Sequence, residues 1–473
     1  MKQSKIRSSF IWSSINVGGS QILGLLFGII LARLLSPEDF GAMAIIVFII
    51  LISHAIVDFG ISQSFIRNQN IVKSDYNTLF YFSLLIGLSC TCLIYLCSKL
   101  LDIYYHSYNL DTLIKVMSIS PTIFALMIVN NTIIIKKLDF KLKSKITLTA
   151  ISISGFISII MAMTDYGIWS LVMLQLLNPF LTMIFLWLKV QWRPEIQFSY
   201  ISLKKHLNFG LKNVTSMILN IFYTKSFIIL LGKYFTLSDA GFYTRADNIK
   251  NIPNSMIVKI ITRVSFPVLS KYQNDKKSFE EKNIFIIKST AILTIPIMIG
   301  LASISEHLIV FLIGEKWLPS SEILFYLCIA GIFVPFDSLN MNALKVNGKM
   351  NTFLLLEVTK FFLIIPALFI GFYYGLKAML FSVIIHSITS FIISSIVSGK
   401  ITNYHISNYI SDLFQPIIFS VFMFIIVTTI QDYFMINYFF ELIFSILLGV
   451  IIVTFLYEIF KNKQYLNLRN NLF

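Results

Sequence analysis

Long apolar runs, separated by short polar stretches, recur along the whole chain. A run of about 20 residues is long enough to cross a hydrocarbon core of roughly 30 Å as an α-helix. The pattern therefore predicts an all-α polytopic membrane protein with about fourteen transmembrane helices. Their expected ranges are 10–33, 40–61, 78–98, 112–135, 146–164, 167–189, 207–231, 240–268, 284–304, 322–345, 351–372, 375–398, 413–431 and 437–459.

Turn chemistry supports several of these boundaries. Ser36-Pro37-Glu38-Asp39 provides a cap residue with proline at the first helical position. Asp165-Tyr166-Gly167 and Tyr374-Gly375 are typical of tight turns between consecutive spans. The apolar run from Phe10 to Leu35 is too long for a signal-peptide core, so we expect it to remain as the first helix.

Composition and charge agree with a membrane protein. The 473 residues are 56% hydrophobic and 13% charged, and their net charge is +15. That charge could indicate nucleic-acid binding, but alternate short loops on the expected inner side hold 26 lysines and arginines and those on the outer side hold 5. This asymmetry is the positive-inside pattern, so we expect both termini in the cytoplasm and no nucleic-acid partner.

A faint internal repeat divides the chain. "LARLLSPEDFGAMA" (31–44) and "LLGKYFTLSDAGFYT" (230–244) share a helix end, a polar turn and an Asp-x-Gly triplet that opens the next helix. Chance similarity between apolar helices is an alternative, but repeats of about six spans are common in transporters. We expect an N-lobe with six spans (1–190), a cytoplasmic linker with a surface-lying helix (191–206), a C-lobe with six spans (207–400) and a C-terminal helix pair with a tail (401–473).

The stretch "SDAGFYTRADNIKNIPNSMIVKI" (238–260) places several charges inside an expected span. Each charge in hydrocarbon costs roughly 2.5–3.5 kcal/mol, so this helix has to face water or polar partners. Either it lines a basic, water-filled cavity for an anionic ligand, or Asp247 pairs with Lys250 or Arg245 and the polar face joins helices; a misplaced helix boundary is the third reading. The residues that share one face at helical spacing are Arg245, Asn248, Ile252, Ser255 and Lys259.

Polar residues on other spans extend this candidate cavity. The preceding span carries Lys225 beside a row of amides and hydroxyls, and the first span has a shorter polar face. The predicted lining consists of the cations Arg245, Lys250, Lys259 and Lys225 and the polar residues Asn16, Ser20, Asn213, Asn220 and Asn248.

A further set of ionisable residues could couple transport to an ion gradient. His54 and Asp58 stand at i,i+4, so that one can hydrogen-bond the other, either as a titrating pair or as a structural contact. Glu357 and Lys360 stand at i,i+3 and are expected to neutralise each other. The candidates for ion coupling are Asp58, His54, Asp337 and Glu357, with His386 as a further one.

Motifs of enzymes are missing from the sequence. "SGKIT" (398–402) lacks the leading glycine of a phosphate-binding loop and follows a membrane helix, and there is no HExxH. The four cysteines lie in apolar runs, typical of buried small hydrophobes. We expect no catalytic residue, no metal and no cofactor, which leaves a secondary transporter or a lipid translocase.

Several motifs together carry a family resemblance. "LARLLSPEDFGAMA" is followed in order by "VDFGISQSFIRN" (57–68), "AGFYTRADNIKNIP" (240–253), "FPVLSKYQND" (266–275) and "LNMNALKVNGKMN" (339–351). The chain resembles Wzx-type polysaccharide flippases, the polysaccharide-transporter branch of the multidrug/oligosaccharidyl-lipid/polysaccharide exporter superfamily. The resemblance covers nearly the whole chain at spacings that fit fourteen spans.

The resemblance implies a multi-pass flippase of the bacterial inner membrane. Such proteins move undecaprenyl-diphosphate-linked oligosaccharide repeat units to the periplasmic leaflet for O-antigen of lipopolysaccharide, capsule or exopolysaccharide, together with a polysaccharide polymerase and a chain-length regulator. Related flippases have two lobes around a cationic central cavity, and some use a groove at the last two helices for the lipid tail. Coupling to a proton or sodium gradient has been inferred for the class.

On this basis we expect Arg245, Lys250 and Lys259, helped by Lys225, to bind the diphosphate, since Arg forks and Lys charges suit phosphate oxygens. Alternating access would rock one lobe against the other. A lipid II flippase or a small-molecule exporter of the same superfamily is the alternative. A membrane glycosyltransferase would need a carboxylate on an outer loop, for which only Glu306 and Glu315 are near.

Overall fold

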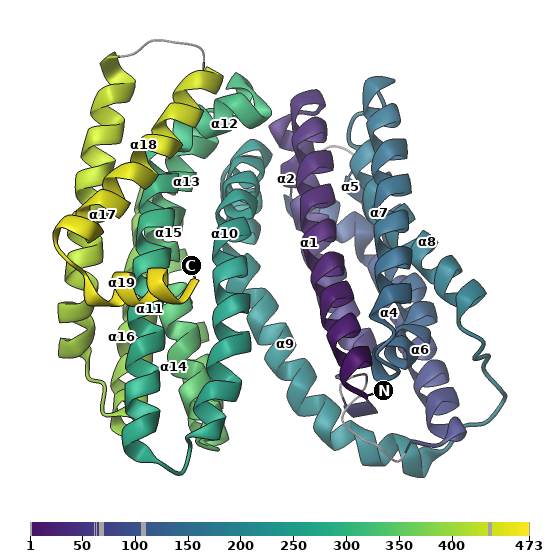
Figure 1. Cartoon of the computed structure of the whole chain (residues 1–473). Helices are drawn as coiled ribbons and strands as arrows, with labels where there is room; N and C mark the ends of the chain where they lie inside the picture. The colour runs from purple at the N-terminus through teal and green to yellow at the C-terminus, as the bar shows by residue number, and fades with distance from the viewer. Residues whose placement is uncertain are drawn as a thin grey trace. The chain divides into compact units, whose positions relative to one another are not determined.

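The computed structural model describes residues 2–60, 62, 64–65, 71–105, 110–433 and 438–472 (Figure 1). Throughout these residues the regular structure is helical, and fourteen segments are long and apolar enough to cross a membrane. The prediction of an all-α protein with about fourteen transmembrane helices is therefore confirmed. The cytoplasmic location of both termini stays a prediction.

Contacts between residues divide the chain into two units, Met1–Gly241 and Phe242–Phe473. The predicted lobes were defined by the sequence repeat and not by contacts, so the ranges 1–190, 191–206, 207–400 and 401–473 stay a prediction. Within the predicted linker, residues 190–199 are not helical and residues 200–206 form the start of the long helix that begins at Tyr200; the surface-lying position of this helical part stays a prediction.

In the first unit, helices pack lengthwise against one another, in parallel pairs such as α1 with α7 and in antiparallel pairs such as α4 with α6. α1 lies beside α7, and α4 lies beside α6, while α9 packs against α2 and α4. An apolar cluster around Leu79, Phe80 and Val129 fills the space between α4, α6 and α8. The helices are α1 (Lys2–Leu34), α2 (Pro37–Asp58), α4 (Lys73–Tyr105), α5 (Leu110–Met117), α6 (Ser120–Lys136), α7 (Phe140–Met163), α8 (Trp169–Lys189), α9 (Tyr200–Tyr234) and the first turn of α10 (Leu237–Lys271).

In the second unit, the last two long helices pack against the rest of the unit (Figure 1). α17 lies against α11, and α18 contacts both α12 and α17 around a buried cluster that includes Phe419, Met423 and Leu442. Besides most of α10, this unit contains α11 (Lys276–Ser303), α12 (Ser305–Ile313), the short 3₁₀ helix η1 (Glu315–Trp317), α13 (Pro319–Gly331), α14 (Val334–Val346), α15 (Met350–Tyr374), α16 (Leu376–Thr402), α17 (Ile406–Tyr433), α18 (Tyr438–Ile459) and α19 (Lys463–Leu472).

Two of the predicted spans are broken helices. The fourth consists of α5 and α6 and the tenth of α13 and α14, with Pro121 and Pro335 in the first turn after each break. Proline has no N–H to donate and fits the first turn of a new helix, which explains where the second piece starts. The predicted tight turns are present: Gly167 and Gly375 both have positive φ angles, of 52° and 89°.

The two turns of the sequence repeat have the same hydrogen bonds. Ser36 caps α2 by accepting from the Asp39 amide at 3.2 Å, while its own N–H and hydroxyl donate to the Asp39 carboxylate at 3.0 and 2.8 Å. Thr236 and Asp239 repeat all three bonds at the start of α10, at 3.1, 3.1 and 2.7 Å. Each turn is thus a reciprocal capping box that satisfies donors a helix start leaves open.

The repeated glycines bring these two helix starts into direct contact. A Cβ on Gly41 would collide with the carbonyl oxygen of Leu237, and a Cβ on Gly241 would collide with that of Pro37. The two contacts are related by the same shift of 200 residues that relates the two triplets, so the turns meet with local two-fold symmetry. Glycine is required here because backbone approaches backbone, with no room for a side chain.

We predict that Gly241→Ala destabilises the protein by about 1–3 kcal/mol, the usual cost of forcing extra atoms into a packed site. The backbone carbonyl that the new methyl group meets cannot turn aside as a side chain could. The measurement is the thermal unfolding midpoint in detergent. Gly24→Ala is the matched control, because nothing lies within 4 Å of its Cβ position. If Gly241→Ala unfolded at the wild-type temperature, the close contact would be wrong.

Candidate functional site

The charged stretch identified in the sequence belongs to α10, a continuous helix of 35 residues with Pro253 and Pro267 inside it. Its predicted polar face is not uniform. Asn248 and Lys259 are exposed, whereas Arg245, Ile252 and Ser255 are partly buried. The face therefore divides into cations held by the protein and cations that reach its surface.

Arg245 and Lys250 belong to the first group. The guanidinium of Arg245 lies 5.9 Å from the ring centroid of Trp317, which is fully buried, in a cation–π contact. The Lys250 ammonium lies 2.9 Å from the Asp247 carboxylate, and the two side chains are only 14% and 11% exposed. The pairing of Asp247 with Lys250, considered above as the alternative to a cavity role, is therefore present.

α13 fixes the other side of Lys250. The stem of that lysine lies against Gly331, where a Cβ would come within 3.4 Å of Lys250 Cδ. One turn further along α10, the Asn254 amide donates to the Gly331 carbonyl at 3.3 Å. Gly331, at the end of α13, thus lets α10 approach closely, and its carbonyl accepts a hydrogen bond from the buried Asn254 side chain.

Lys259 and Arg263 belong to the second group. Both are exposed and stand one turn apart on α10. Arg263 lies inside the predicted span 240–268 but was not included in the predicted lining, and α10 remains helical through it to Lys271. Its spacing of four residues from Lys259 could have predicted it as part of the same polar face, since residues at i and i+4 lie on one side of a helix.

The remaining predicted lining lies in the first unit. On α1, the hydroxyl of Ser20 lies 3.5 Å from the side-chain oxygen of Asn16. On α9, Asn213 contacts Met217 and packs against the backbone of Gly60, while Asn220 is exposed and Lys225 is partly buried. The structure therefore brings Asn16 and Ser20 together, and the role of all these residues in binding stays a prediction.

Two of the predicted ionic contacts are wrong. His54 Nε2 lies 3.1 Å from the Ser120 hydroxyl and stacks on Phe124, whereas Asp58 accepts from Ser62, so His54 and Asp58 do not bond each other. The local spacing allowed their bond, but serines on other turns are nearer.

Lys360 pairs with Asp337 at 2.7 Å and not with Glu357. Neither correction decides whether Asp58, His54, Asp337 or Glu357 couples an ion. Within the described part of the chain, no three His, Cys, Asp or Glu residues are grouped closely enough to hold a metal ion.

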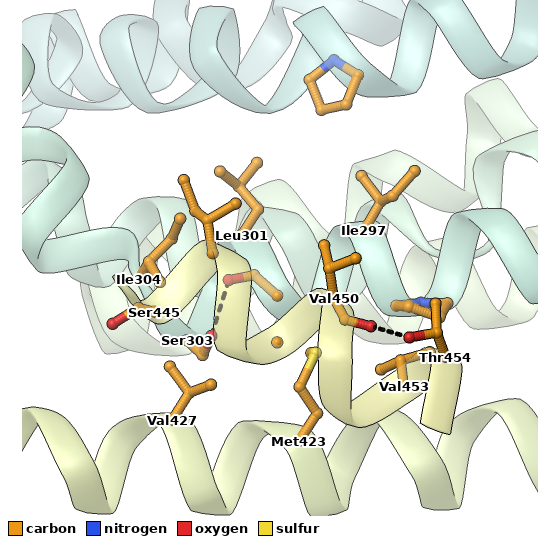
Figure 2. A pocket seen from close by; sticks show the side chains of 15 residues that line it. Ile297, Leu301, Ser303, Ile304, Met423, Val427, Ser445, Val450, Val453 and Thr454 are labelled. Atoms are coloured by element: carbon orange, nitrogen blue, oxygen red, sulfur yellow. Dashed lines mark hydrogen bonds between the residues drawn. The ribbon is translucent and has the colours of Figure 1, made fainter. Parts of the chain in front are cut away.

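An apolar pocket of about 380 Å³ lies within the second unit (Figure 2). Figure 2 shows Ile297 and Leu301 of α11, Met423 and Val427 of α17, and Val450 of α18 around it. The few hydroxyls present are occupied: Ser303 donates to Gly300 and Thr454 to Val450, both at 2.8 Å. Gly300 and Gly449 leave space where side chains would otherwise fill the groove, and Pro253 of α10 also lines it.

This pocket and the cations of α10 are connected by one helix. Pro253 lines the pocket, and Lys259 stands six residues further on, about 9 Å along the helix axis. The pattern of residues alone did not locate the pocket, although the family resemblance implied a groove for a lipid tail at the last two helices; the parts of α11, α17 and α18 that form its walls are apolar, so their sequence does not mark the face that lines it. Its chemistry suits a long apolar chain rather than a polar solute.

Comparisons with known proteins agree with this architecture. A family model described as "Polysaccharide biosynthesis protein" matches residues 30–322, more than half of the chain. The lipopolysaccharide biosynthesis protein WzxC of Escherichia coli (strain K12) is 26% identical over 366 residues, which cover 76% of this chain and 74% of WzxC. The teichuronic acid biosynthesis protein TuaB of Bacillus subtilis (strain 168) is 25% identical over 73% of this chain and 72% of its own length.

The fold is also found in a solved structure. The lipid II flippase MurJ, in an inward closed conformation, superimposes with a TM-score of 0.76 at 20% identity, over 96% of this chain and 99% of MurJ. The resemblance to the polysaccharide-transporter branch of the exporter superfamily is confirmed by these matches. With its fourteen apolar segments, the chain is a multi-pass protein of the bacterial inner membrane and belongs to the polysaccharide biosynthesis protein family.

Proposed function

We propose that this protein is a flippase that moves undecaprenyl-diphosphate-linked oligosaccharide repeat units across the bacterial inner membrane for surface polysaccharide assembly. Membership of the polysaccharide biosynthesis protein family supports the pathway. The likeness of its fold to the lipid II flippase MurJ supports an architecture compatible with moving a lipid-linked sugar. A polysaccharide polymerase and a chain-length regulator would then act on the same product.

The observation that carries this proposal is the course of α10. This helix lines an apolar groove with Pro253 and exposes Lys259 and Arg263 beyond it. A substrate that matches both features has a long apolar chain and an anionic head group. A polyprenyl diphosphate is such an amphiphile, whereas a small cationic drug would meet repulsion from the lysine and arginine.

The cations would act at different stages of binding. Lys259 reaches the surface and can meet a diphosphate without first losing a partner inside the protein. Lys250 is paired with Asp247, so its transfer to a phosphate would also release a carboxylate. Arg245, placed on Trp317, would orient the segment. Lys225 of α9 is proposed as a further cation for the diphosphate. Alternating access of the two lobes would carry the head group across.

We predict that Lys259→Glu lowers surface glycan to a tenth or less of wild type, because the new carboxylate repels a diphosphate where the ammonium attracted it. The assay is complementation in a bacterial strain whose own polysaccharide flippase is deleted, with lipid-linked intermediates measured at the same time. They should accumulate on the inner leaflet. Lys276→Glu makes the same charge change at an exposed residue outside α10 and is expected to support export normally.

If Lys259→Glu and Lys276→Glu supported equal glycan levels, Lys259 would not belong to the binding site. If the wild-type chain itself restored no glycan, the native host should be used, because these proteins can be specific for one repeat unit. Failure there as well, with normal expression, would overturn the flippase assignment.

We further predict that Gly300→Leu blocks the groove and reduces export at least tenfold while the protein still folds. The Cβ position of Gly300 is 3.4 Å from the end of the flexible Met423 side chain, so a leucine can be accommodated by filling the pocket. The measurement is binding of undecaprenyl phosphate to purified protein by native mass spectrometry, beside the export assay. Val421→Phe, at an exposed site of α17 outside the pocket, serves as control. Unchanged lipid binding in Gly300→Leu would show that the tail lies elsewhere.

A lipid II flippase is the second candidate, since the fold of this chain is similar to that of the lipid II flippase MurJ. The two substrates share the undecaprenyl diphosphate and differ in the sugar, so the cations and the groove do not separate them. Rescue of cells depleted of their own lipid II flippase would favour this candidate. Rescue of surface glycan alone would favour the repeat unit.

A further inference from the structure

A second pocket, of about 520 Å³, lies in the first unit, between the N-terminal part of α1 and the turn that joins α6 to α7. Unlike the apolar groove of the second unit, it is lined by charged and polar side chains. Its walls include Ser9, Trp12, Lys137, Leu138, Asp139 and Lys141. These residues belong to other helices than the cations of α10, so this pocket is separate from the site described above.

Hydrogen bonds between α1 and the residues around the turn fix the walls of this basic pocket. The Ser9 hydroxyl donates to the Leu138 carbonyl at 2.9 Å, which ties α1 to the turn. The Ser144 hydroxyl of α7 lies 2.7 Å from the carbonyl oxygens of both Trp12 and Phe140, so that it joins α7 to α1. The pocket is therefore formed by backbone segments that the protein holds in place.

Two lysines give the basic pocket its charge. Lys137 and Lys141 are both exposed, and the Lys141 ammonium lies 5.8 Å from the ring centroid of Trp12, in a cation–π contact. Asp139 adds one negative charge, and its carboxylate caps α7 by accepting from the Leu142 amide at 3.1 Å. Because two ammonium groups face one carboxylate, the described lining has a surplus of positive charge.

The basic pocket also lies near the ends of two apolar spans. Trp12 stands near the start of the apolar segment Ile11–Leu34, and the turn leads directly into the segment Phe140–Met163. Tryptophan is enriched at the boundary between membrane and water. Leu138, in the turn itself, leaves 44% of its side chain exposed beside Lys137. We therefore expect the pocket at the level of the lipid head groups, with apolar surface next to its cations.

Positive charge alone would not indicate a binding site here, because lysines and arginines are common at the cytoplasmic ends of membrane helices. Lys137 and Lys141 differ from such lysines because both line one cavity together with an aromatic ring. Lys276 and Lys277, two exposed lysines at the start of α11, do not line it. Basic pockets between membrane helices on the cytoplasmic side are typical binding sites for the head groups of anionic lipids.

We propose that this pocket binds the phosphate group of an anionic membrane phospholipid, with Lys137 and Lys141 as its cations. The acyl chains follow the apolar surfaces of α1 and α7 into the bilayer. The Asp139 carboxylate accepts a hydrogen bond from a hydroxyl of a head group such as that of phosphatidylglycerol, whereas a choline head group has no such donor. A bound lipid then links α1 to the turn before α7.

The test is binding of phosphatidylglycerol to the purified full chain, measured by native mass spectrometry. Lys137→Gln with Lys141→Gln should weaken binding about tenfold, because each lysine near the membrane surface adds to the attraction of an anionic lipid. The unfolding midpoint should stay that of the wild type, since both lysines are exposed. Lys137→Arg with Lys141→Arg keeps both charges and should bind as the wild type does.

Lys276→Gln with Lys277→Gln is the matched control. It removes the same two charges from exposed lysines outside the pocket and should leave the affinity for phosphatidylglycerol unchanged. Equal binding by the two pairs of glutamine variants would overturn the proposal, because the lysines of the pocket would then contribute no more than any surface charge.

Two other probes identify the kind of ligand. Phosphatidylcholine has the phosphate but no net charge, so it should bind more weakly than phosphatidylglycerol. Equal binding of the two lipids would show that the pocket does not select an anionic lipid. Glycerol 1-phosphate has the anion but no acyl chains and should not displace phosphatidylglycerol at equal concentration. Displacement would assign the pocket to a soluble phosphate ester and overturn the lipid assignment.

Undecaprenyl phosphate distinguishes this proposal from the flippase function. Its binding should be unchanged in Lys137→Gln with Lys141→Gln, because its proposed partners lie on α10 and in the apolar groove. Loss of undecaprenyl phosphate binding without loss of phosphatidylglycerol binding would assign the pocket to the transported lipid and overturn the proposal. If the wild-type chain exports no glycan, the flippase function fails, while the binding of phosphatidylglycerol still decides whether this site exists.

Discussion

The absence of water from the hydrocarbon core is the constraint on which this structure depends. Helices satisfy the backbone internally, but a polar side chain there still needs a partner. In the second unit, this requirement is met by contacts between spans or between turns. Lys250 has Asp247, Arg245 has the ring of Trp317, and Lys360 has Asp337. The contacts of Arg245 and Lys360 therefore also fix how their helices are placed, whereas Lys250 and Asp247 neutralise each other within α10.

α10 also carries exposed cations. Lys259 and Arg263 reach the surface of the described chain, one turn apart, on a helix that also borders an apolar groove. A surface that combines two cations with an apolar groove is complementary to an amphiphile. An apolar chain alone, or an anionic group alone, would use only one of the two features. The contact of Arg245 with Trp317 holds the helix in place, and Lys259 lies at the surface, where a ligand can reach it.

Much of the fold could be predicted because membrane helices are encoded locally. Length and hydropathy were sufficient for the fourteen spans, and Ser36 with Asp39 was sufficient for a capped helix start. The predicted partner of Lys360 was wrong because helical spacing offers only Glu357, whereas Asp337 lies 23 residues away and meets it only after α14 and α15 pack.

The same limit applies to the groove. α17 and α18 are apolar on all sides, so hydropathy does not distinguish the face that lines a pocket from the face that meets lipid. Two glycines, Gly300 and Gly449, lie in this pocket, but glycines that simply allow close helix packing have the same appearance in a sequence. Arg263 was missed for a different reason: it lies inside the predicted span, but its spacing of four residues from Lys259 was not used to extend the predicted lining.

The repeat shows how similar geometry can serve different chemistry. The two helix starts, capped by Ser36 and Thr236, share their hydrogen bonds, and each glycine receives the backbone of the other turn. Beyond these turns the likeness ends: α2 continues as an apolar helix, whereas α10 carries Arg245, Lys250 and Lys259. The shared turns constrain where both helices begin, but the sequence beyond them decides what each helix carries: α2 has no lysine or arginine, and the cations lie on α10 alone.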